Sequence, residues 1–156
     1  MIEFEKSFLN SPNSSPSPCD FCTLLHMGSN DVTYVADLLA STVFLYRDQF
    51  YKGRLLVVYR THAENFLDLT VDAQSELYRD AILAANVLNA IFKPDLINFA
   101  MFGNVIRHTH WHVIPRYRNE KQWGQPPWPH ERTFFKQDSD YRGIAAQIRA
   151  AIEVVR

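Results

Sequence analysis

The stretch "RHTHWHVIPR", residues 107–116, places a histidine at every second position, at His108, His110 and His112. Together with the preceding Val105 and Ile106 it is typical of a β-strand, which we expect over residues 105–114. Side chains alternate between the two faces of a strand, so the histidines should form a row on one face, about 7 Å apart. Trp111 lies on the opposite face, which should meet the core. The row of histidines is therefore left for a ligand.

Other segments predict the rest of the fold. Three are rich in β-branched and aromatic residues and should be strands, at 41–47, 54–60 and 95–102. Thr70 is a suitable N-cap for a helix that runs to about Phe92, and Ser139 for a last helix over residues 140–155. A proline-rich loop should fill residues 115–138, and a Ser/Pro/Asn-rich irregular arm residues 1–18. This order predicts an α+β fold with an antiparallel sheet, a long central helix and a C-terminal helix.

Bulk properties limit the classes of function. A chain of 156 residues suggests one domain over residues 1–156, whose C-terminal part, 118–156, is the loop and last helix. The net charge of −1 gives no excess of positive charge to attract long nucleic acid, although a small nucleotide needs only a local site. No apolar run reaches the ~20 residues of a membrane span, and the N-terminus lacks the pattern of a secretory signal. We therefore expect a cytoplasmic protein without a membrane partner.

The histidine row allows three interpretations. The residues could be scattered without a common role. All three could bind one metal ion, although neighbours about 7 Å apart on a flat strand rarely converge on bonds of about 2 Å. Alternatively, an imidazole, neutral at physiological pH, could attack phosphorus while its neighbours donate hydrogen bonds to the phosphate oxygens. A metal site made by two of the three histidines also remains open.

Cys19 and Cys22 form a Cys-x-x-Cys pair. Two thiolates at this spacing can share one zinc ion, which then needs two more ligands. A redox pair and two unlinked thiols remain alternatives, but a redox pair usually opens a helix after a strand, and this pair follows the Ser/Pro arm.

Taken together, these motifs resemble the histidine triad (HIT) superfamily. "HTHWHVI" resembles its His-x-His-x-His motif, and "YKGRLLVVYRTHAENFLDLT" resembles its hairpin. "INFAMFGNVIRHTHWHVIPRY" resembles the prokaryotic branch with a His-x-His-Trp-His strand. With "CDFC", the similarity covers roughly residues 19–117. A single His-x-His-x-His would be a weak signal, whereas this combination is specific.

The resemblance implies a nucleotidyl hydrolase acting at an α-phosphate. It makes His110 the nucleophile and His112 the residue that holds the phosphate, with Asn104 and Asn98 as further phosphate contacts. The substrate would be a nucleoside phosphoramidate or a dinucleoside polyphosphate. A nucleotide sensor with negligible turnover, a metalloenzyme and a nucleotidyl transferase remain alternatives.

The resemblance also implies a structural zinc and a homodimer. Some relatives complete the zinc site with residues that correspond to His62 and His108, which would leave His110 and His112 for chemistry. Two positions depart from the pattern and bear on substrate choice. Tyr46 stands near the place of a nucleoside-binding Asn, and Arg54 replaces a histidine found in many eukaryotic relatives.

The proline-rich loop contains a histidine and two tryptophans that could contribute to a site. His130 could lie in a segment that covers a site. Trp123 and Trp128 could stack on a nucleobase, but packing in the core or at an interface is the better expectation.

Overall fold

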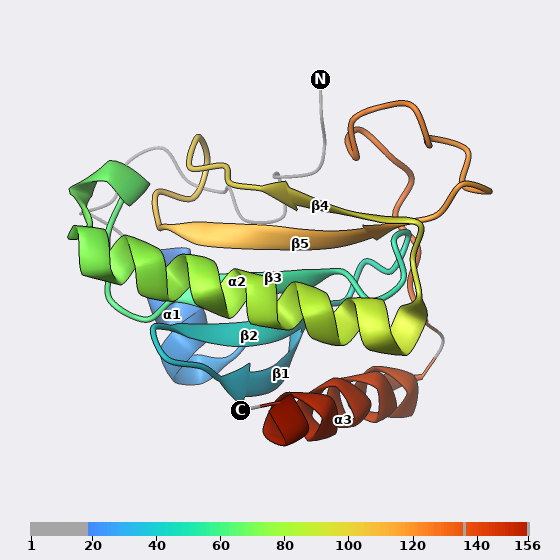
Figure 1. Cartoon of the computed structure of the whole chain (residues 1–156), viewed down its shortest axis with the longest axis horizontal. Helices are drawn as coiled ribbons and strands as arrows, with labels where there is room; N and C mark the ends of the chain where they lie inside the picture. Colours follow the sequence, from blue (N-terminus) through green and yellow to red (C-terminus); the bar gives the residue numbers. More distant parts are fainter. Residues whose placement is uncertain (1–18, 136, 156) are drawn as a thin grey trace.

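The structure, a computed structural model, describes residues 19–135 and 137–155, so the predicted arm at 1–18 lies outside the described residues. Its centre is a five-stranded antiparallel sheet in the order β1-β2-β3-β5-β4 (Figure 1). The strands are β1 Val32–Asp37, β2 Ser41–Tyr46, β3 Leu55–Tyr59, β4 Leu96–Ala100 and β5 His110–Arg116. The helices are α1 Asp20–Met27, α2 Val71–Phe92 and α3 Asp138–Val155, with a short 3-10 turn, η2, at Phe66–Asp68. The predicted α+β fold is confirmed.

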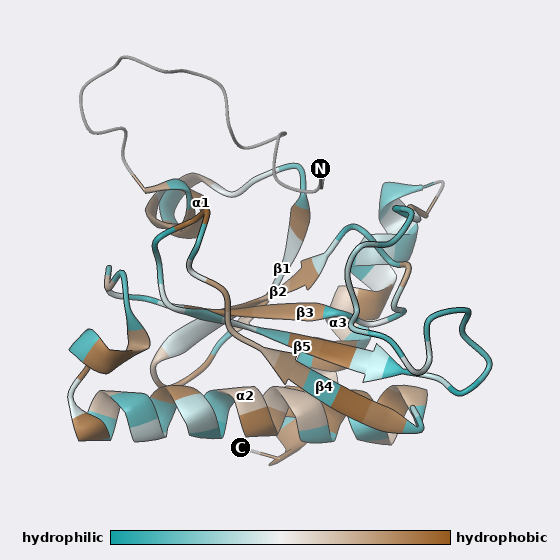
Figure 2. Cartoon of the chain, turned by 90° about the horizontal axis from the view of Figure 1, so that it is seen from above, coloured by the Kyte–Doolittle hydropathy of each residue, from teal (hydrophilic) through white to brown (hydrophobic). Residues whose placement is uncertain are grey.

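The helices divide between the two faces of the sheet, with α2 on one side and α1 on the other (Figure 2). The main core lies between the sheet and α2 and α3, where Leu77 and Leu88 of α2 are fully buried with Val57 and Val113 of the sheet. On the opposite face, Phe21 and Leu24 of α1 pack against a smaller group of buried residues. This group consists of Val32, Phe44, Tyr46, Leu56 and Val58.

The long helix begins and ends as the sequence indicates. The Thr70 hydroxyl accepts a hydrogen bond from the Ala73 amide at 3.2 Å, which satisfies one of the free donors of the first turn. Lys93 adopts a left-handed conformation after Phe92, and Pro94 follows, so the helix cannot continue. None of the described helices is long and apolar enough to cross a membrane.

Several boundaries correct the expectations. The last strand, β5, begins at His110 and continues to Arg116, so the prediction of residues 105–114 is wrong at both ends. Before it, the Thr109 amide and hydroxyl both donate to the Ala63 carbonyl, at 2.8 and 3.0 Å. These two hydrogen bonds hold Thr109 against the loop after β3, so His108 lies outside the strand. The row on one strand face therefore holds only His110 and His112.

Two further corrections concern the ends of the chain. The last helix begins at Asp138, so Ser139 lies in its first turn and is not its cap. The first helix and first strand were not predicted at all. In α1, Phe21 and Leu24 are the two buried residues, too few for a clear helical repeat of apolar positions. In β1, a register shift between Tyr34 and Ala36 interrupts the two-residue alternation.

Candidate active site

Strand β5 places His110 and His112 on the face of the sheet that α1 covers. Their cross-strand neighbours, Val58 and Leu56, belong to the α1 side of the core. Trp111 instead packs with the α2 side, as the alternation predicts. His110 and His112 are 4% and 7% exposed, so both imidazoles work in a largely dehydrated environment.

His110 is oriented by the backbone. Its Nδ1 lies 2.7 Å from the carbonyl oxygen of His108, and only a protonated ring nitrogen can donate to a carbonyl. The proton is therefore on Nδ1, and Nε2 carries the lone pair. Burial lowers the pKa of His110 to about 4, although the hydrogen bond to His108 acts in the opposite direction. At neutral pH, His110 is an uncharged imidazole whose unprotonated Nε2 is nucleophilic.

His112 stands beside this nitrogen. The Nε2 atoms of the two rings are 3.3 Å apart, and Nδ1 of His112 lies 3.3 Å from Nη2 of Arg54. Burial, and then the positive charge of Arg54, lower the pKa of His112 well below its usual value. Both rings are therefore neutral at physiological pH, and His112 can reach any group bound next to His110 Nε2.

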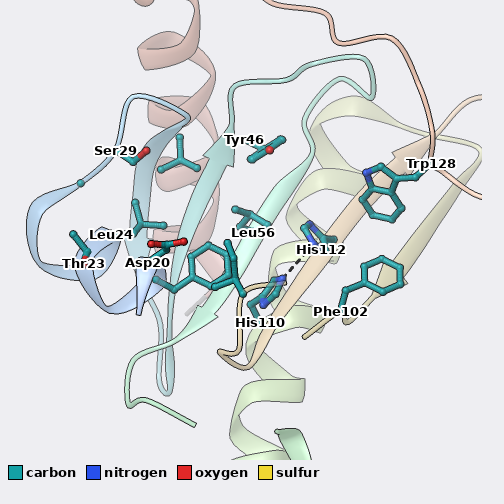
Figure 3. Close-up of a pocket in the computed structure, with 14 residues that line it drawn as sticks. Asp20, Thr23, Leu24, Ser29, Tyr46, Leu56, Phe102, His110, His112 and Trp128 are labelled. Atoms are coloured by element: carbon teal, nitrogen blue, oxygen red, sulfur yellow. Dashed lines mark hydrogen bonds between the residues drawn. The ribbon is translucent and has the colours of Figure 1, made fainter. Parts of the chain in front are cut away.

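A cavity of about 530 Å³ opens over the two histidines. Thr23 and Leu24 of α1 lie on one side of the pair, and Phe102 and Trp128 lie on the other (Figure 3). Its lining is mostly apolar, with three polar side chains from the α1 region: Asp20, Thr23 and Ser29. The Phe21 ring meets His110 edge to face, with the centroids 4.7 Å apart. An apolar cavity with a few polar groups is the usual form of a small-molecule site.

The other predicted substrate contacts lie in different places. Tyr46 lines the cavity. Arg54 has no exposed surface and lies behind His112 instead of on the cavity wall. Asn98 accepts a hydrogen bond from Arg116 at 2.7 Å, and Asn104 is exposed and lines a separate hollow with Glu64 and Arg107. The hollow of Asn104 also includes His108, whereas His110 and His112 line the cavity, so the contact of Asn104 with a bound phosphate stays a prediction.

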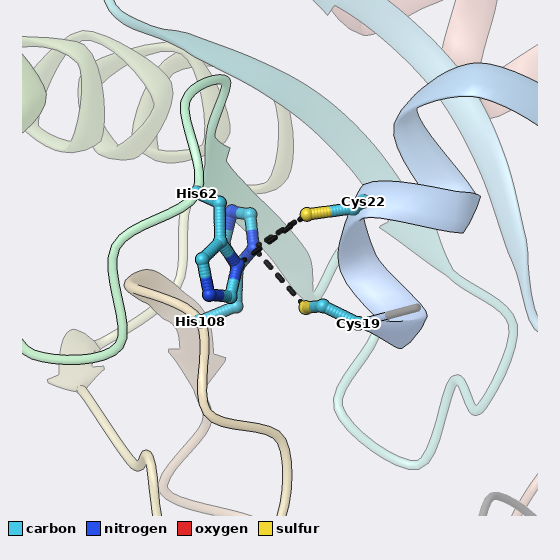
Figure 4. A group of neighbouring side chains, drawn as sticks. All are labelled: Cys19, Cys22, His62 and His108. Carbon is cyan, nitrogen blue, oxygen red and sulfur yellow. Dashed lines mark hydrogen bonds between the residues drawn. The ribbon is translucent and has the colours of Figure 1, made fainter. Parts of the chain in front are cut away.

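A metal cluster stands next to the histidine pair. Cys19, Cys22, His62 and His108 point toward one another, and their four donor atoms lie within 4.8 Å of one another (Figure 4). Cys19 Sγ lies 3.3 Å from His108 Nδ1, and Cys22 Sγ lies 3.4 Å from His62 Nδ1. A tetrahedral zinc with ordinary bond lengths needs donors about 3.3–3.8 Å apart, so these contacts fit the ion.

A backbone carbonyl orients one ligand of this cluster, His108. Nε2 of His108 lies 2.7 Å from the Tyr59 carbonyl oxygen, so it is the protonated nitrogen and Nδ1 is free to bind metal. Four protein ligands fill a tetrahedral shell and leave no position for substrate, which makes this a structural zinc site. Although Cys19 and Cys22 do open a helix, α1, both thiols contact imidazoles, and this supports metal binding over a redox pair.

Sequence reasoning missed two aromatic residues of the cavity, Phe21 and Phe102, and favoured packing for a third, Trp128. Phe21 stands inside the Cys-x-x-Cys pair, and that position was the available signal, because a metal site at both cysteines must fix the residue between them. Trp128 comes from the proline-rich loop, where packing was expected. Nothing in the local sequence of Phe102 points to the cavity.

The antiparallel sheet, the histidine pair and the Cys/His cluster together define a histidine triad protein. The family model described as HIT domain matches residues 28–119, more than half of the 156 residues, and the chain belongs to this family. An uncharacterized HIT-like protein of Mycoplasma genitalium is 28% identical over 119 residues, covering 71% of this chain and 82% of that protein.

Solved structures share the fold. A histidine triad protein from Bradyrhizobium japonicum is 27% identical, with a TM-score of 0.72, and the match covers 78% of this chain and 91% of the other. A hypothetical histidine triad nucleotide-binding protein from Sulfolobus tokodaii has a TM-score of 0.70 at 22% identity, covering 88% and 93%. A Zn-bound histidine triad family protein from Mycobacterium smegmatis has a TM-score of 0.67 at 19% identity, covering 88% and 95%.

Proposed function

We propose that this protein hydrolyses nucleotides at the α-phosphorus through a covalent nucleotidyl-His110 intermediate. The substrate is a nucleoside phosphoramidate or a dinucleoside polyphosphate, and the product is a nucleoside monophosphate. The observation that carries the proposal is the 2.7 Å contact between His110 Nδ1 and the His108 carbonyl oxygen, because it leaves the lone pair on Nε2 beside the cavity.

The reaction has two displacements at phosphorus. The Nε2 lone pair of His110 forms a bond to the α-phosphorus, while the bond to the leaving nitrogen or oxygen breaks. The leaving group takes the electron pair, and an amine also takes a proton from solvent. Water then attacks the same phosphorus, the bond to His110 breaks, and the proton of the water passes to solvent. His112, 3.3 Å from the attacking atom, is placed to contact the phosphate oxygens in both steps.

The cavity supports a nucleoside as the bound group. Its apolar walls suit the faces of a nucleobase, and the exposed Phe102 adds aromatic surface for stacking. The Sulfolobus tokodaii neighbour is named a nucleotide-binding protein, which agrees with this assignment.

The zinc site supports a mechanical role beside the chemistry. The ion would join α1 to the loop after β3 and to His108, and would hold Phe21 against His110. The Mycobacterium smegmatis neighbour is described as Zn-bound. His110 and His112 do not belong to the four-residue cluster, which argues against a catalytic ion held by the histidine row. Thiol ligands also suit a reducing compartment, and we infer the cytoplasm as the location.

We further propose that the protein is a homodimer that pairs through β4. This strand is at the edge of the sheet, and it carries Leu96 and Phe99 at 52% and 39% exposure. An apolar edge strand is favourable for pairing with a second copy. Light scattering coupled to size exclusion should give twice the monomer mass, and Phe99→Lys should give the monomer mass. A monomeric wild type would contradict the assembly.

The proposed reaction is tested by intact mass after rapid quenching with an adenosine phosphoramidate. Wild type should show a transient adenylyl adduct and release AMP, whereas His110→Ala should show no adduct and a rate at least about a thousandfold lower. His26→Ala, which changes an exposed histidine of α1, is the matched control and should behave like wild type. Wild type that turns over neither phosphoramidates nor dinucleoside polyphosphates would refute the proposal, as would full activity in His110→Ala.

A further inference from the structure

Asp48 lies in the turn after β2 and is only 2% exposed. Its Oδ1 accepts hydrogen bonds from the amides of Phe50 and Thr133, at 3.2 and 3.0 Å. Its Oδ2 lies 2.6 Å from Nε2 of His130 and 3.8 Å from Nη1 of Arg54. Burial alone would raise the pKa of Asp48, but the hydrogen bonds from His130 and the two amides hold it below its usual value. A buried carboxylate therefore stands between the C-terminal loop and Arg54.

His130 fastens the loop to this carboxylate. Its second ring nitrogen, Nδ1, lies 2.8 Å from the carbonyl oxygen of Pro127, one residue before Trp128. The imidazole also packs against the rings of Phe50 and Tyr51, with centroid distances of 4.8 and 5.2 Å. Both nitrogens and the ring faces are thus engaged, so the segment that carries Trp128 is fixed over the hairpin between β2 and β3.

Arg54 is enclosed by this arrangement. Its guanidinium packs over the rings of both Tyr46 and Trp128, with its central carbon 4.4 and 4.8 Å from their centroids. Burial lowers the pKa of Arg54 to about 10, so the group is still charged at neutral pH. Asp48 supplies the nearby negative charge that a buried cation requires.

The contact of Arg54 with His112 decides the position of a proton. A guanidinium can donate hydrogen bonds but cannot accept them. Nδ1 of His112, 3.3 Å from Arg54 Nη2, must therefore be the acceptor, and the proton of the neutral ring is on Nε2. That N–H faces Nε2 of His110 and the cavity. His112 then offers a donor to phosphate oxygens, whereas the other tautomer would turn a lone pair toward them.

We propose that Asp48, His130 and Arg54 are positioning residues: Asp48 and His130 fix Arg54, and Arg54 holds His112 as the tautomer protonated on Nε2. The effect on turnover rests on the proposed hydrolase function, but the tautomer of His112 does not. A merely structural role for these residues would affect folding without selecting a tautomer.

The test combines ¹⁵N NMR of the imidazole rings with steady-state kinetics on an adenosine phosphoramidate. His112 is assigned by comparison with His112→Gln. In wild type at neutral pH, His112 should show a protonated Nε2 and an unprotonated Nδ1. Arg54→Met should shift His112 toward the other tautomer and lower kcat about 10- to 100-fold, the range known for residues that orient metal-binding histidines. Arg54→Lys, which keeps a donor, should recover part of the wild-type signal and rate.

Asp48→Asn and His130→Phe should change the His112 signals and kcat in the same direction as Arg54→Met. Asp80→Asn is the matched control, because Asp80 is also a buried carboxylate that accepts two backbone amides, from Leu39 and Ala40. It should lower the melting temperature and leave the His112 signals and kcat unchanged.

A protonated Nδ1 on His112 in wild type would overturn the inference without any variant, even if Arg54→Met failed to fold. Unchanged His112 signals in folded Arg54→Met would overturn it as well. A wild type with the expected tautomer but no turnover would leave the inference standing and remove the hydrolase proposal. Normal turnover with the wrong tautomer would do the reverse.

Discussion

His108 contributes to two sites at once: its backbone carbonyl accepts the Nδ1 hydrogen of His110 at 2.7 Å, and its side chain belongs to the Cys/His cluster. The side chain is held from both ends, by Cys19 at Nδ1 and by the Tyr59 carbonyl at Nε2. Any displacement of His108 must therefore move the group that orients His110. The metal cluster and the proposed nucleophile are mechanically coupled through one residue.

The first prediction concerns the metal. Protein prepared without chelator should contain one zinc per chain, and His62→Ala should lose it. Loss of a structural metal belongs to the class of changes that cost about 4 kcal/mol or more, and each kcal/mol should lower the melting temperature by about 2–4 °C in a chain of this size. Metal analysis and calorimetry measure both effects. His26→Ala, which changes an exposed histidine, is the control. Zinc-free wild-type protein that is as stable as the zinc-containing protein would contradict the prediction.

The second prediction separates Asn104 from the active site. Asn104 is exposed and lines a different hollow from His110 and His112, so Asn104→Ala should leave kcat/KM unchanged and alter the unfolding free energy by no more than the ~0.5 kcal/mol typical of surface positions. His112→Ala, measured in parallel, should lose far more. A large loss in Asn104→Ala would show that the loop before β5 closes onto the bound phosphate.

The third prediction uses two glycines with opposite expected signs. Gly53 has a φ of +87°, and a Cβ there would lie 2.8 Å from the Phe92 ring, so Gly53→Ala should destabilise the protein by more than about 1 kcal/mol. Gly143 is in α3, and a Cβ there would meet nothing within 4 Å, so Gly143→Ala should stabilise it by about 0.5–1 kcal/mol. Urea unfolding measures both. Equal effects of the two changes would refute the steric account.

The fourth prediction follows from the lowered pKa of Asp48. A carboxyl whose pKa is lower in the folded state stabilises the protein above its unfolded pKa, and this contribution is lost as the pH falls through the folded value. The advantage of wild type over Asp48→Asn in unfolding free energy should be full at neutral pH and shrink below the ordinary value of 3.8. Denaturant unfolding between pH 7 and pH 3 measures it. A constant difference would show that Asp48 does not titrate differently on folding.

Much of the fold could be predicted because the signals are local. The central helix is marked by a Thr cap, an apolar stripe and a following proline, and β2 and β3 by runs of β-branched residues. The side of β5 that holds Trp111 followed from strand alternation alone. In contrast, the start of β5 depends on Thr109 bonding to Ala63, a contact across the fold that no local pattern encodes.

The sequence by itself determined the types of chemistry present: an alternating histidine row and a cysteine pair at zinc spacing. These features depend on residue identity and on the two-residue alternation of a strand, and both can be read from neighbouring residues in the sequence. The resemblance to the HIT superfamily already implied how the histidines divide, with His108 in the metal cluster and His110 left for chemistry. Only the tertiary structure decided that Phe21, Phe102 and Trp128 line one cavity with His110 and His112. It also decided that Arg54 lies behind His112 and that Asp48 meets His130, 82 residues away. Such contacts form because distant segments fold onto one sheet, and burial then makes each hydrogen bond and charge depend on partners far along the chain.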